Sequence, residues 1–86
     1  MIIKKELIKR TIAGDTVLVP VGKTVLEANG LFVLSEVAAF IWDLLPQAED
    51  EEAIVAAVLA EYEVSQEVAR QDVADFLAQL KKMQIL

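Results

Sequence analysis

Residues 31–45 read LFVLSEVAAFIWDLL and contain the one change of hydrophobic period in this chain of 86 residues. Leu31 to Leu34 is a continuous apolar run that follows a turn signal, Asn29-Gly30, and this is typical of a short strand. From Ser35 onward the apolar residues recur at the three- and four-residue spacing of a helix. Ser35 suits the position before a helix because its hydroxyl can accept a hydrogen bond from a free amide of the first turn. We therefore expect strands before this point and helices after it.

Two further strands are predicted upstream. Thr16 to Val21 is short and β-branched, and Leu7 to Ala13 is its expected partner, with Gly14-Asp15 as the two-residue connection of a hairpin. Pro20 cannot donate a hydrogen bond to a neighbouring strand, so the second strand should end there or leave that position unpaired. Thr24 to Ala28 fits either a fourth short strand or a loop that carries packed side chains.

Three helices are predicted after Ser35. The first ends at Leu45 because Pro46 disfavours helical geometry in the residue before it. The second begins at Glu49, and the third follows a second cap at Ser65 and runs to about Met83. The expected buried stripes are Val37, Phe40, Ile41, Leu44 and Leu45; Ile54, Val55, Val58, Leu59 and Tyr62; and Ala69, Val73, Phe76, Leu77 and Leu80. Strands followed by helices predict an α+β fold, a three-stranded antiparallel sheet with three helices on one face, as a single domain over residues 1–86.

The composition argues against an enzyme. The chain has no His and no Cys, which excludes a thiolate nucleophile, an imidazole base and a Cys/His zinc site. Ser35 and Ser65 stand at helix starts without a His partner, so both are interpreted as caps. The carboxylates of Glu49 to Glu52 are consecutive at a helix start, where they interact with the helix dipole, whereas calcium loops space their ligands alternately. We expect no catalytic residue, no cofactor and no metal.

The charge is unevenly distributed along the chain. Residues 1–23 hold five basic and two acidic side chains, a net charge of +3, and the remainder holds three basic and twelve acidic side chains, a net charge of -9. The acidic part would repel nucleic acid, whose binding depends on Lys and Arg. The longest apolar run, Ala53 to Ala60, is too short to cross a bilayer, and no secretory signal is recognisable. We therefore expect a cytoplasmic protein that binds neither nucleic acid nor membrane.

The run Leu31 to Leu34 points to a binding surface. Neighbouring side chains of a strand point to opposite faces, so this run places large apolar residues on both faces of a small sheet, and helices cover only one of them. A strand at a sheet edge also presents unpaired amides and carbonyls, onto which another chain can add. That chain is either a peptide or a second copy, which would give a weak homodimer or a structural oligomer.

Several stretches resemble the PqqD-like family, whose founding member acts in the synthesis of coenzyme PQQ (pyrroloquinoline quinone). The resemblance extends from about Ile8 to Leu86, and its most specific part is a strand that ends in Leu, a capping residue, two Ala and an Ile-Trp pair. The stretches that carry it are Leu18 to Gly22, Leu34 to Leu45, Glu52 to Val55 and Asp72 to Leu80. The resemblance implies a winged-helix-like arrangement of three strands and three helices.

The function that this resemblance implies is peptide recognition without catalysis. Such domains bind the leader of a ribosomally made precursor peptide and present it to a modifying enzyme, often a radical S-adenosylmethionine maturase. The leader adds as a strand to the third strand, in a groove formed with the third helix. Carried onto this chain, the groove comprises Leu31, Phe32, Val33, Leu34, Asp72, Asp75, Phe76 and Gln79. The alternative from topology is a winged-helix nucleic-acid-binding protein, which the acidic third helix disfavours.

This sequence departs from the family pattern at three places. The family commonly has Asn where Ser35 stands, and the two residues are equivalent caps. It commonly has Asp-Gly after the first helix, where this chain has Leu45-Pro46-Gln47. It also commonly has Gly before the final apolar pair, where this chain has Gln84. None of the three lies in the expected groove.

Overall fold

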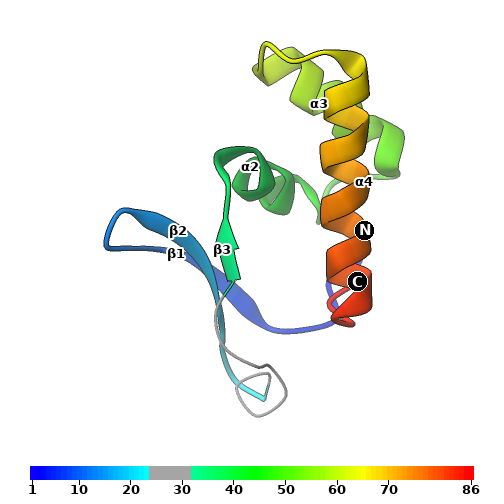
Figure 1. The fold of residues 1–86 in the computed structure, drawn as a ribbon. Helices are drawn as coiled ribbons and strands as arrows, with labels where there is room; N and C mark the ends of the chain where they lie inside the picture. The colour runs from blue at the N-terminus through cyan, green and yellow to red at the C-terminus, as the bar shows by residue number, and fades with distance from the viewer. Residues whose placement is uncertain (24–31) are drawn as a thin grey trace.

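The computed structural model describes residues 1–23 and 32–86, which form strands followed by helices (Figure 1). The elements are β1 (Leu7–Ile12), β2 (Asp15–Pro20), β3 (Phe32–Leu34), α2 (Glu36–Leu44), α3 (Glu51–Glu61) and α4 (Gln66–Lys82). This order confirms the predicted α+β class and is compatible with a winged-helix-like arrangement. The predictions for Thr24 to Ala28 and for Leu31 lie outside the described residues.

The three strands form one antiparallel sheet in the order β1-β2-β3. Residues directly opposite each other on neighbouring strands share a face, so Leu18 and Phe32 point to one side and Val17 and Val33 to the other. Leu18 is fully buried against the helices, whereas 69% of the surface of Val33 is exposed. In Figure 1 the β1–β2 hairpin extends away from the helices, while β3 lies beside α2.

The hairpin turn is one residue earlier than predicted. Ile12 pairs with Asp15, so the two turn residues are Ala13 and Gly14, with φ of 51° and 85°. A turn of this kind needs positive φ at both central positions, and it matches the twist of the flanking strands. Asp15 is thereby left in β2, and the predicted strand ends at Ala13 and Val21 were each one residue too long. Pro20 is the last residue of β2, as expected.

Short polar side chains begin all three described helices. Ser35 and Ser65 accept hydrogen bonds from the amides of Ala38 and Val68, both at 3.1 Å, which confirms the two predicted caps. The predicted start of the second helix at Glu49 was wrong, because the Asp50 carboxylate accepts from the Ala53 amide at 2.8 Å and α3 begins at Glu51, two residues later. Asp reaches this amide more readily than the longer Glu. In the described part of the chain, no helix has the length and apolarity needed to span a bilayer.

The core lies between the helices and one face of the sheet. It includes Leu18 and Leu34 from the sheet, and the entire predicted stripe of α4 is buried: Ala69, Val73, Phe76, Leu77 and Leu80. The stripe of α3 is narrower than predicted. Ile54, Val55 and Val58 are buried, but Leu59 is 36% exposed because it lies at the margin of that face. Phe40 and Tyr62 meet edge to face, with ring centroids 5.4 Å apart, which joins α2 to the end of α3.

The last residues fold back onto the core through a cap of α4. The Gln84 amide donates to the Lys81 carbonyl at 3.0 Å and the Ile85 amide to the Leu80 carbonyl at 2.9 Å. This pair of bonds is the Schellman motif, which requires a left-handed residue after the helix, and Gln84 has a φ of 61°. Ile85 is buried as a result, and its carbonyl accepts from the Lys4 amide at 2.7 Å. The final apolar pair is therefore packed although glycine is missing from the turn.

Replacing Gln84 by glycine is expected to stabilise the fold. A residue with a Cβ destabilises the fold by about 1–2 kcal/mol in the left-handed region, and glycine avoids this cost. Glycine also loses more backbone entropy on folding, which cancels part of the stabilisation. We expect the free energy of unfolding to rise by about 0.5–1 kcal/mol and Tm to rise by a few degrees. Thermal unfolding followed by circular dichroism measures the change. Gln84→Ala is the control, and an equal rise in both variants would contradict the explanation by backbone strain.

Candidate functional site

A groove of about 520 Å³ lies between β3, α4 and the first turn of α2. All of β3 lines it, with Leu18 of β2 and Ile41 of α2 at its base and Ser35, Val37 and Ala38 at the start of α2. Leu18 and Ile41 are fully buried, so the base is rigid and apolar. The site is a preformed hollow against an edge strand.

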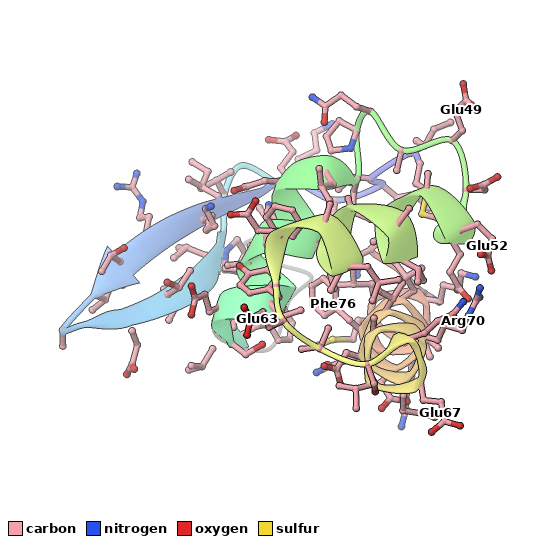
Figure 2. All side chains as sticks on the ribbon, turned by 90° about the horizontal axis from the view of Figure 1, so that it is seen from above. Glu49, Glu52, Glu63, Glu67, Arg70 and Phe76 are labelled. Atoms are coloured by element: carbon pink, nitrogen blue, oxygen red, sulfur yellow. The ribbon has the colours of Figure 1, made fainter. Side chains whose placement is uncertain are left out.

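One stripe of α4 forms the opposite wall of the groove. Its members recur at intervals of three or four residues and therefore share one side of the helix: Asp72, Asp75, Phe76, Gln79, Leu80 and, just after the helix, Met83. Phe76 and Leu80 also belong to the buried stripe, whereas Asp72, Asp75 and Gln79 are exposed. In Figure 2 Phe76 points from α4 toward the interior. The wall is thus apolar below and polar at its rim.

Among the described residues of β3, Val33 directs its backbone N–H and C=O away from β2, toward the outer edge of the sheet. The Val21 amide donates to the Glu6 carbonyl at 3.0 Å, so the odd-numbered residues of β2 bond to β1. Bonding alternates along an antiparallel strand, and the even-numbered residues of β2, Thr16 and Leu18, therefore bond to Leu34 and Phe32. The N–H and C=O of Val33 then point away from β2. No described strand pairs with this edge of the sheet.

The charges that line the groove are of one sign. Asp72 and Asp75 are its charged lining residues, and no Lys or Arg is among the described residues that line it. The Asp75 carboxylate accepts from the Gln71 side-chain amide at 2.7 Å, a neutral partner that leaves its charge uncompensated. The groove therefore combines an apolar base, an open strand edge and a negative rim.

Comparison with known proteins identifies the family. The pattern of the family described as coenzyme PQQ synthesis protein D (PqqD) matches residues 15–86. The chain belongs to the PqqD family. Among solved structures, it is similar to TbiB1 in complex with the TbiA(beta) leader peptide, with a TM-score of 0.74 and 31% identity over 100% of this chain and 94% of that one. A comparison with curated proteins finds no match.

In this PqqD-family chain, nearly all of the residues named from the sequence line the same groove. Phe32, Val33 and Leu34 contribute its strand side, and Asp72, Asp75, Phe76 and Gln79 contribute its helix side. Leu31 lies outside the described residues. The predicted set did not include seven other lining residues: Leu18, Ser35, Val37, Ala38, Ile41, Leu80 and Met83. The expectation that Ser35 lies outside the groove was wrong, because the cap residue follows β3 directly and stands at the start of α2. Val37 and Ile41 lie one helical turn apart, on the stripe that the sequence assigns to the core. This spacing is the sequence signal that could have placed both residues on the face that lines the groove.

The pKa shifts of Glu52, Tyr62 and Arg70 arise away from the groove of this PqqD-family chain. The hydrogen bond and charge of Arg70 lower the pKa of Glu52, and Glu52 in turn raises the pKa of Arg70. The second bond of this pair, from Arg70 Nη2 to Glu52 Oε2, is 3.0 Å long, and Figure 2 shows the two side chains where α3 meets α4. Burial raises the pKa of Tyr62, with Glu36 and Glu61 adding to the shift. The Glu52–Arg70 pair joins two helices and does not contribute to the groove.

Proposed function

We propose that this chain binds the leader of a ribosomally made precursor peptide, which adds as a strand to β3 and occupies the groove beside α4. The open backbone of Val33 carries the proposal, because an edge strand beside a preformed apolar groove supplies both parts of strand addition. Main-chain hydrogen bonds give affinity, and side-chain pockets give specificity. The similarity to a protein that was solved with a leader peptide supports the same assignment.

The bound leader would be presented to a modifying enzyme, such as a radical S-adenosylmethionine maturase. In this role the chain is a cytoplasmic adaptor of one domain that has no catalytic activity of its own. The absence of His and Cys from the sequence supports this division of labour, because the chemistry then belongs to the partner. Membership of the PqqD family supports a role beside such an enzyme.

A binding titration tests the proposal. The probes are fluorescein-labelled synthetic leaders of any short precursor peptides encoded beside the gene for this chain, and the readout is fluorescence anisotropy. We expect saturable binding, no binding of a scrambled peptide, and no binding of a labelled DNA duplex at the same salt concentration. Sedimentation with and without the leader detects self-association through the same edge. Binding of the duplex without binding of the leader would reject the proposal, as would a dimer that the leader does not dissociate.

A further inference from the structure

The exposed edge of β3 sets the register of an added strand. Only Val33 of Phe32–Leu34 directs its N–H and C=O outward, so one residue of the incoming strand, here called x, exchanges both hydrogen bonds with it. The side chain of x lies on the face of Val33, away from the helices. Side chains alternate along a strand, so the two neighbours of x point toward Phe32, Leu34 and the groove.

The length of the groove limits how many side chains it can read. Its helix wall runs from Asp72 to Met83, and at a rise of about 1.5 Å per residue this spans roughly 16 Å. An extended strand advances about 3.3 Å per residue, so roughly five residues fit beside the wall. If x is central, two of these five point into the groove. Specificity therefore depends on the residues directly before and after x.

The two ends of the groove differ in chemistry. In Figure 1 α4 runs antiparallel to β3, so the Asp72 end of the wall lies toward Leu34 and the Met83 end toward Phe32. The end of the groove near Leu34 carries two formal negative charges, those of Asp72 and Asp75. The positive end of the α2 dipole lies there too, but it amounts to only about half a charge, and Glu36 in the first turn opposes it. The end near Phe32 is apolar, because Phe32 and Met83 form it and both pack against the core.

We propose that the groove selects an extended peptide with the pattern basic–x–apolar, in which Lys or Arg lies over Asp72 and Asp75 and a large apolar side chain lies between Phe32 and Met83. The order follows from antiparallel addition, the direction of both strand pairs in this sheet and the slightly more stable one per residue, because the incoming strand then enters at the Leu34 end. This inference rests on the proposed function and adds its selectivity. A second copy of the chain fits poorly, because edge-to-edge pairing of β3 would bring two acidic rims together.

Selection from a phage-displayed library of random peptides tests the pattern without knowledge of the natural leader. The enriched peptides are synthesised, labelled and titrated against the whole chain. We expect Lys or Arg two positions before a large apolar residue, and a Kd at least about fivefold weaker for the double variant Asp72→Asn/Asp75→Asn. Raising the salt concentration from about 0.1 to about 1 M, which shortens the Debye length from about 10 to about 3 Å, should weaken wild-type binding and affect the double variant much less.

The matched control is Glu63→Gln/Glu67→Gln. It removes the same two charges from exposed residues that do not line the groove, near the start of α4 (Figure 2). We expect this variant to bind like the wild type. An equal loss of affinity in both double variants would mean that net charge acts at long range, which would overturn the assignment to Asp72 and Asp75.

The outcomes distinguish this inference from the proposed function, strand addition of a leader, on which it rests. Enriched peptides that shift the Val33 amide resonance but lack a positioned basic residue would overturn the pattern and leave strand addition standing. Peptides that bind without shifting that resonance would overturn both, and so would a library that yields no binder. A basic–x–apolar consensus whose affinity depends on Asp72 and Asp75 supports the pattern.

Discussion

Leader binding is expected to weaken at least about tenfold when Val33 is replaced by proline. Proline lacks the amide hydrogen that Val33 directs toward the incoming strand, and its ring occupies the place of that hydrogen. Removing this donor leaves a carbonyl of the leader unpaired, which costs about 1–3 kcal/mol, and the clash with the ring adds to that cost; every 1.4 kcal/mol changes Kd tenfold. The fold should persist because the lost amide does not bond to β2. Phe32, which precedes the substitution, is already extended, as proline requires.

The control for this substitution is Val33→Thr, which keeps the amide hydrogen and the β-branched shape. Anisotropy with the labelled leader gives both affinities, and thermal unfolding shows that both variants are folded. Equal binding by the folded Val33→Pro and Val33→Thr variants would show that the leader does not use this edge. Since 69% of the Val33 surface is exposed, the Val33→Thr variant should resemble the wild type.

The largest expected loss of stability follows Leu77→Ala. Leu77 is 1% exposed in the centre of the α4 stripe, and truncation of such a leucine costs about 2–5 kcal/mol through lost burial and the cavity left behind. A chain of this length is expected to have a total stability of only about 4–13 kcal/mol. The variant should therefore unfold at least about 10 °C below the wild type.

Leu59→Ala makes the same chemical change at a residue that is 36% exposed. We expect less than half of the loss seen at Leu77, because much of the side chain already contacts water and no closed cavity forms. Urea unfolding with a common slope compares the two variants. Similar losses at both residues would place Leu59 in the core, as its helical spacing suggested, and would contradict the packing described for α3.

Local chemistry made most of the fold predictable. Ser35 and Ser65 were recognised as caps because a hydroxyl before an apolar stripe has one favoured role. The predicted position of the hairpin turn was wrong by one residue. Gly14 suits either central position of such a turn, and which one it occupies depends on how the two strands pair. Leu59 was assigned to the core because spacing identifies a face but not its width, which the neighbouring helices determine.

The site was predictable where one element supplies a regular pattern. Asp72, Asp75, Phe76 and Gln79 share a helix face by spacing alone, and the family resemblance placed that face beside the third strand. Leu18 and Ile41 enter the groove from two other elements, β2 and α2, so only the tertiary arrangement brings them beside that face. The outward direction of the Val33 backbone depends on whether the odd-numbered or the even-numbered residues of β2 bond to β1. The amino-acid composition of the strands does not encode this choice.

Amide hydrogen exchange at Val33 tests strand addition most directly. In the free chain its N–H points to solvent from the edge of β3, whereas Phe32 and Leu34 already bond to β2. Exchange is measured by NMR with and without a leader that binds in the anisotropy titration. The account predicts fast exchange at Val33 in the free chain and strong protection after the leader binds, with much smaller changes at Phe32 and Leu34. A Val33 amide that exchanges equally fast in the presence of saturating leader would contradict it.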